Sequence, residues 1–246
     1  MSGDISRVLA TGAAATALAA VFLFGEHIHP LRALTRNRRS LLSISAGVSL
    51  AYVFVRLLPE LADARLTFAS STILPARFEG IAVYVLGLLG FIVFYGLEHF
   101  TKRARLALAE SDVPDPRLRI LGFSAYACLI AYLVVDSLDN SVGGLAAYTV
   151  AMGVHFLTVD HRFREEPGET YRRRGHLLLA MAVLVGWGMG LLFALPRDIL
   201  ALMIGFLSGG VIINSMISEL PSGERQTFVP FAAGGLLYSM VLIPLN

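Results

Sequence analysis

The chain has 246 residues, of which 56% are hydrophobic and 15% are charged, and its mean hydropathy is +0.68. A charged fraction this far below the roughly 25% of soluble domains indicates a membrane protein. The net charge is +2, and 19 of the 20 basic residues are arginine, the exception being Lys102. The single cysteine, Cys128, excludes an intrachain disulfide and a cysteine-rich zinc site. The basic clusters resemble membrane-flanking loops, so nucleic acid is not an expected partner.

Eight apolar stretches follow one another along the chain, each about long enough to cross a bilayer. A hydrocarbon core about 30 Å thick needs roughly 20 residues of helix. A backbone in lipid must also satisfy its own hydrogen bonds, as a helix does. We therefore expect an all-α integral membrane fold in which residues 1–246 form one polytopic domain. The expected spans are residues 5–24, 40–58, 80–97, 120–135, 142–159, 177–195, 199–217 and 227–245.

Basic residues are distributed unequally between the connectors. The first, third and fifth connectors hold four, five and five of them, whereas the second, fourth and sixth together hold only Arg65, Arg77 and Arg197. The positive-inside rule places arginine-rich connectors in the cytoplasm. We therefore expect a multi-pass protein with cytoplasmic odd-numbered connectors and both termini outside.

The second and seventh expected spans share a pattern. A small-residue patch, Ser45–Val48 in one and Ser208–Val211 in the other, precedes about ten apolar residues and an ionisable residue just before a proline. The spacing differs by one residue, and the two spans cross the membrane in opposite directions. Such a pattern predicts an inverted repeat, which is typical of transporters with a substrate site near the repeat interface. Alternatively, the small residues only let helices pack closely.

On these residues the chain resembles the ZIP (Zrt/Irt-like) family of divalent-metal transporters. Ala46–Leu50 with Leu57–Glu60 is similar to the family's second span, Gly90–Glu98 to its third and Gly209–Pro221 to its seventh. The resemblance implies a 3+2+3 bundle of eight helices with an inverted repeat of spans 1–3 and 6–8. It also implies that the fourth and fifth spans form a path for a transported divalent ion such as zinc, and that the chain is a transporter and not an enzyme.

The fourth and fifth spans depart from the family's metal-binding motifs. Tyr126 and Ile130 stand where the resemblance would place ligands on the fourth span. On the fifth span His155 is retained, Val159 stands in place of a glutamate, and Asp160 follows one position late. The resemblance therefore implies the scaffold together with an altered metal centre.

A metal centre requires about four to six converging donors from His, carboxylate or thiolate side chains. In the alternative interpretation Cys128 is a small buried hydrophobe and His155 is hydrogen-bonded within the bundle. The candidate metal ligands are His155, Asp160, His161, Cys128, Glu60 and Glu219.

A second candidate cluster lies at the expected cytoplasmic ends of the odd-numbered spans. Spans one, three and five each end in an acidic residue followed by a histidine. We interpret this cluster as a weak divalent-metal site. Alternatively, histidine is favoured at helix C-termini by electrostatics, by roughly 0.3–1 kcal/mol. The residues are Glu26, His27, His29, Glu98 and His99, with Asp160 and His161 in the equivalent place on the fifth span.

Arg56 is a basic residue inside an expected span, and it stands where the family's second span carries a histidine. A charge at mid-depth costs roughly 3 kcal/mol or more, so we expect Arg56 to reach the outer interface. Glu60 is four residues further on and could form a charge pair with it. In a functional interpretation Arg56 repels divalent ions and acts in gating.

Three hypotheses follow. In the first, the chain transports a divalent metal through an altered centre, and in the second a ZIP-fold protein carries another solute or serves as a partner protein. The third, an intramembrane enzyme, is the weakest, because Asp136 and Asp139 lie near the outer end without a histidine in that leaflet. The bilayer is the expected partner, and the sequence leaves a homodimer open.

Overall fold

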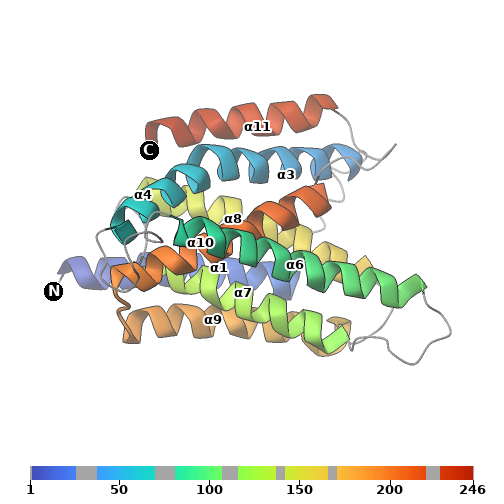
Figure 1. Cartoon of the computed structure of the whole chain (residues 1–246), viewed down its shortest axis with the longest axis horizontal. Helices are drawn as coiled ribbons and strands as arrows, with labels where there is room; N and C mark the ends of the chain where they lie inside the picture. The colour runs from blue at the N-terminus through green and yellow to red at the C-terminus, as the bar shows by residue number, and fades with distance from the viewer. Residues whose placement is uncertain are drawn as a thin grey trace.

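The structure is a computed structural model that describes residues 2–25, 38–69, 81–106, 116–136, 142–165, 171–219 and 228–245. Every regular element in these ranges is helical, which confirms the all-α membrane class (Figure 1). The elements are α1 (Ser2–Phe24), α3 (Arg38–Tyr52), η2 (Val53–Leu57), α4 (Leu58–Ala69), α6 (Ala82–Leu106), α7 (Pro116–Asp136), α8 (Val142–Glu165), η3 (Tyr171–Gly175), α9 (His176–Leu192), α10 (Arg197–Glu219), α11 (Phe228–Leu242) and η4 (Ile243–Leu245).

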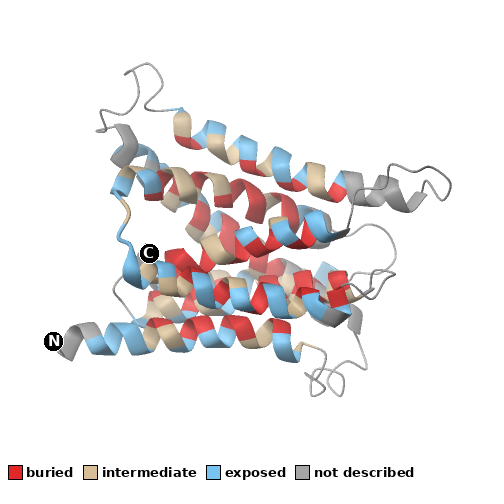
Figure 2. Cartoon of the chain, turned by 90° about the horizontal axis from the view of Figure 1, so that it is seen from below, coloured by how far each residue is buried: buried red, intermediate tan, exposed pale blue. Residues whose placement is uncertain are grey.

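Each expected span overlaps a helical run, but several ends differ: α6 ends at Leu106 and not at residue 97, α8 at Glu165 and not at residue 159, and α9 at Leu192 and not at residue 195. Six runs within the described residues are long and apolar enough to cross a membrane, and α9 and α11 are shorter apolar helices. The outward faces are apolar, as lipid requires: Val85, Leu88 and Ile92 on α6 are exposed, and so are many large side chains on α9 and α11 (Figure 2). The surface is therefore suited to a multi-pass membrane protein.

The second span extends further than expected. The sequence predicted its end at Leu58, but α4 continues through Pro59 to Ala69. Pro59 cannot donate a backbone hydrogen bond, and the turn before it, η2, is a π-helix in which the Leu58 N–H donates to the Val53 carbonyl. This wide turn carries the chain past the proline, so the helix does not end there.

The helices pack in two groups of four spans. In the first group α1 packs on α8 and α9, and α7 packs on α9. The second span consists of α3, η2 and α4. In the second group α11 packs on α3, and α6 packs on α10, which also contacts α3 and α4 (Figure 1). The groups meet through smaller contacts, mainly of α3 with α8, and of α7 with α6 and α10.

Glycines set the closest approaches in the second group. A Cβ atom on Gly47 would collide with the Phe231 carbonyl and lie 2.6 Å from the Gly235 nitrogen, so α3 and α11 touch there backbone to backbone. A Cβ atom on Gly209 would collide with the Gly87 carbonyl and lie 2.6 Å from the Phe91 nitrogen, which joins α10 to α6 in the same way. Small residues therefore hold both pairs together.

The two ends of the bundle differ. The chain enters α1 and leaves α11 at the same end (Figure 1). At the opposite end α6 and α8 finish and α7 and α9 begin, and this end carries Arg119, Arg162, Arg164 and Arg172. We call it the arginine end, and it corresponds to the face expected to lie in the cytoplasm.

Candidate functional site

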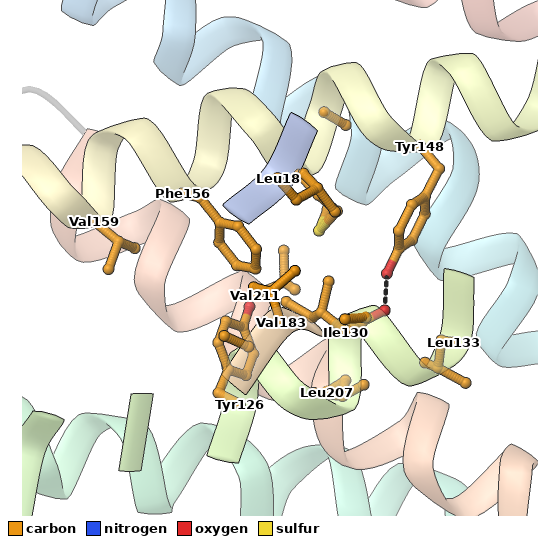
Figure 3. Close-up of a cluster of buried hydrophobic side chains, with 14 of the residues drawn as sticks. Leu18, Tyr126, Ile130, Leu133, Tyr148, Phe156, Val159, Val183, Leu207 and Val211 are labelled. Carbon is orange, nitrogen blue, oxygen red and sulfur yellow. Dashed lines mark hydrogen bonds between the residues drawn. The ribbon is translucent and has the colours of Figure 1, made fainter. Parts of the chain in front are cut away.

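The centre of the bundle, between α7 and α8, is packed with apolar side chains. Tyr126, Ile130 and Phe156 are almost fully buried there, and they face Leu18 of α1 and Val211 of α10 (Figure 3). These are the two spans to which the family resemblance assigns the metal path. Tyr126 and Ile130, which replace the expected ligands, contribute to this apolar core.

His155 lies beside this core with 1% of its surface exposed. Its Nε2 is 3.2 Å from the Tyr126 hydroxyl, and the two side chains are hydrogen-bonded. Its buried Nδ1 has no hydrogen-bond partner among the residues that the structure describes. The Tyr126 and Phe156 rings lie with centroids about 6 Å from the imidazole. His155 is thus held within the bundle by a tyrosine from α7. This agrees with the interpretation of His155 as a hydrogen-bonded residue of the bundle.

The structure brings no second candidate metal ligand to His155 among the described side chains. No group of three His, Cys, Asp or Glu side chains in the described parts of the chain lies close enough to hold a metal ion. Cys128 lies where α7 approaches α9 closely, because a Cβ atom on Gly186 of α9 would collide with the Cys128 carbonyl. Cys128 is partly buried.

Asp160 is buried near the arginine end of α8, where protein groups satisfy its carboxylate. Arg164 Nε donates to Oδ2 at 2.7 Å and the Tyr171 hydroxyl donates to Oδ1 at 2.6 Å. Arg164 also donates to the Phe22 carbonyl, so the cluster joins α1, α8 and η3. Burial and the negative charge of Asp160 raise the pKa of Tyr171, which keeps its hydroxyl protonated as a donor. The Asp160 cluster therefore connects elements of the first group to one another.

Glu98 forms a second buried charge cluster at the same end. Its Oε2 lies 3.0 Å from Nη2 of Arg119 and 2.7 Å from Nη2 of Arg162. Arg119 is 3% exposed, and its guanidinium lies 4.4 Å from the centroid of the Phe163 ring. One carboxylate from α6 is therefore shared by two arginines from α7 and α8.

Arg56 and Glu60 lie in η2 and in the first turn of α4, toward the end opposite the arginines. Both side chains are partly exposed, whereas Tyr52 at the end of α3 is buried. Tyr52 in turn packs edge-on against Tyr148 of α8, with ring centroids 6.1 Å apart. Direct pairing of Arg56 with Glu60 stays a prediction.

The remaining site predictions are placed only in part. His99 is exposed, its ring stacks on Tyr95, and His161 is partly buried. Glu219 is the last residue of α10, and its side chain lies outside the described part. Glu26, His27 and His29 also lie outside the described residues, so the acid–histidine cluster stays a prediction.

Sequence reasoning did not identify four residues of the two charge clusters as parts of a site: Arg119, Arg162, Arg164 and Tyr171. A signal existed for Arg164, because it follows Asp160 by four residues, a spacing that brings opposite charges together on a helix. The other contacts join residues from different helices, and no spacing in the sequence indicates them.

Comparison with known proteins gives no further guide to the family, because no family model and no curated protein matches the chain.

Proposed function

We propose that this chain is a membrane transporter with the 3+2+3, ZIP-like architecture and an inverted repeat of spans 1–3 and 6–8. The packing of the helices supports the repeat. Exchanging the first span with the sixth, the second with the seventh, the third with the eighth and the fourth with the fifth converts the α3–α11 pair into α10–α6. It also converts the α7–α9 pair into α8–α1. All four of these pairs are in contact.

The observation that carries the proposal is the shared register of two glycine contacts. Gly47 of α3 meets the Phe231 carbonyl and the nitrogen four residues later, and Gly209 of α10 meets the Gly87 carbonyl and the nitrogen four residues later. A reciprocal contact lies three residues away in each pair, where a Cβ on one helix would meet a backbone carbonyl of the other. These contacts are Gly234 against Ile44 and Gly90 against Phe206.

This register also removes the one-residue mismatch in the sequence pattern. With Gly47 equivalent to Gly209, Pro59 and Pro221 each follow their glycine by twelve residues. Two helix pairs that cross the bilayer in opposite directions with the same contacts are the building plan of many secondary transporters, whose substrate sites lie between the repeats. Transport therefore accounts for the architecture better than an enzyme or a passive anchor does.

For the cargo we propose a divalent metal ion such as zinc, held at an altered centre that includes His155. The support is the family resemblance and the position of His155, which lies on the fifth span and whose Nδ1 has no hydrogen-bond partner in the described part of the chain. A neutral imidazole nitrogen is a common zinc ligand.

A second candidate function is a ZIP-fold protein that carries another solute or none. The observation that favours it is the Tyr126–His155 pair, which uses Nε2 of His155 in a mostly apolar environment. A site without a carboxylate offsets little of the charge of a divalent ion.

Uptake into proteoliposomes distinguishes the two candidates. Metal transport predicts uptake of radioactive zinc or cadmium above protein-free liposomes, about one zinc bound per purified chain, and loss of both with His155→Ala. Tyr95→Phe, at an exposed position, should leave uptake unchanged. Absence of both uptake and stoichiometric binding in folded protein would reject the metal and favour the second candidate.

A further inference from the structure

We propose that Glu98, Arg119 and Arg162 form an ionic latch that holds the two groups of helices together at the arginine end and closes the interface between them from that side. The inference rests on the proposed transport function in one respect: a transporter must open the interface between the two groups, so a contact that closes it has a role. Whether water-soluble molecules reach this interface can be measured without knowing the transported solute.

The latch bridges the two groups. Glu98 lies on α6 in the second group, whereas Arg119 and Arg162 lie on α7 and α8 in the first. Both guanidiniums approach the same carboxylate oxygen, at 3.0 and 2.7 Å. The groups cannot separate at this end without parting that oxygen from both arginines.

The latch is largely buried. The side chains of Arg119 and Glu98 are 4% and 9% exposed, so water screens their attraction less than at a surface, and removing one charge leaves the other buried without compensation. Arg119 is also held from the side, over the Phe163 and Phe123 rings. The Arg162 side chain is more exposed, at 19%.

A layer of aromatic rings lies behind the latch on the same interface. Phe94 is one turn before Glu98 on α6, and its ring centroid lies 5.7 Å from that of Phe123 and 4.8 Å from that of Tyr126, both on α7. Tyr126 in turn is bonded to His155. The charges and the rings therefore close the route from the arginine end to the centre in series.

The Asp160 cluster provides a matched contrast. It is also a buried carboxylate with an arginine at the same end, but all of its partners, Arg164, Tyr171 and the Phe22 carbonyl, belong to the first group or to η3, which leads into it. Breaking it should loosen one group without parting the two. The latch and the Asp160 cluster thus differ in which helices they connect.

The test measures access to a cysteine placed behind the latch. Leu207 is suitable because it is buried on α10 three residues before Gly210, whose Cβ would lie 2.8 Å from the Phe94 ring, and so lies on the side of the ring layer away from Glu98 (Figure 3). Purified Leu207→Cys protein in a Cys128→Ala background is reconstituted in nanodiscs. Its rate of modification by a charged, water-soluble methanethiosulfonate reagent is then measured.

Glu98→Gln should raise this rate about tenfold or more, equivalent to about 1.4 kcal/mol in the opening equilibrium. Arg162→Gln, a milder change at a more exposed position, should raise it less and serves if Glu98→Gln does not fold. Asp160→Asn should leave the rate within about twofold of the parent, because a factor of two is well under 1 kcal/mol.

Two results would overturn the latch. One is an unchanged rate in folded Glu98→Gln and Arg162→Gln proteins, and the other is an equal increase in Asp160→Asn, which would indicate general loosening. Failure of the proposed function has a different signature: the rates change as expected while no solute uptake is found.

Discussion

At the scale of single residues, the buried polar groups differ in how completely the protein satisfies them. Both oxygens of Asp160 accept strong hydrogen bonds, so its charge is compensated inside the bundle. His155 has only one bonded nitrogen. A buried polar atom without a partner costs stability, so proteins generally retain one where a ligand, a proton or a movement makes use of it. Among the described residues Ser49 and Asn214 also bury a polar atom without a hydrogen bond, but of these three only His155 carries a nitrogen that commonly binds a metal ion or a proton.

We expect Tyr126→Phe to lower the free energy of unfolding by about 1–3 kcal/mol, because it leaves His155 with no partner on either nitrogen. In a His155→Phe background the same change should be nearly neutral, since neither partner is then polar. Thermal unfolding of the four proteins in one detergent measures the coupling. Tyr95→Phe, at an exposed ring, is the control, and equal costs of Tyr126→Phe in both backgrounds would show that the hydrogen bond contributes nothing.

Only part of the site can be read from spacing. The separation of Asp160 and Arg164 by four residues indicates an ion pair on one helix, and His155 is singled out by its place in the fifth span. The partners of Glu98 could not be predicted, because Arg119 and Arg162 lie on other helices, just outside the expected spans 120–135 and 142–159. Whether they meet depends on how deeply each helix is set and how it is rotated.

At the scale of elements, backbone contact between helices explains why the glycines sit where they do. The α3–α11 and α6–α10 pairs approach so closely that no side chain fits between them. In lipid, where apolar surfaces gain little by leaving their solvent, such contact is a main source of helix association. The structure thus confirms the small-residue pattern as a packing device, and the inverted repeat stays a prediction.

Alanine substitution tests this equivalence. Gly47→Ala and Gly209→Ala should each lower stability by about 1–3 kcal/mol or more, and by similar amounts, because each must push apart a backbone contact of the same kind. Gly188→Ala on α9 has nothing within 4 Å of its added Cβ and should be neutral or stabilising by up to about 1 kcal/mol. Melting temperatures in detergent give the comparison, and a tolerated Gly209→Ala beside a damaging Gly47→Ala would argue against equivalent pairs.

At the scale of the whole molecule, the arginine distribution predicts the orientation in the membrane. Entry and exit of the chain at one end fit eight crossings, and both buried ion clusters lie at the other end (Figure 1). The positive-inside rule places that end in the cytoplasm. Because flanking arginines are retained on the cytoplasmic side during insertion, the prediction concerns every connector at once.

Single cysteines in a Cys128→Ala background test the orientation. Ser111→Cys in the third connector should react with an impermeant thiol reagent only from the cytoplasmic side, and Ser137→Cys in the fourth only from outside. Labelling of intact cells and of inside-out vesicles provides the measurement, and permeabilised cells control for buried thiols. Reaction of both positions from the same side would contradict the alternating topology.

The sequence by itself determined the helical membrane class and the order of eight apolar runs, because hydropathy and helix length are local properties of the chain. It placed several helix ends less well, since α6 and α8 continue past their apolar runs into charged residues. It failed at Pro59, where a π-turn lets the helix continue. Only the tertiary structure decided that the spans pack in two groups of four, that Tyr126 takes up His155, and that Glu98 is shared by arginines from two other helices. Those outcomes depend on the rotation and depth of packed helices, and the free energies that fix them arise from contacts between residues far apart in the chain.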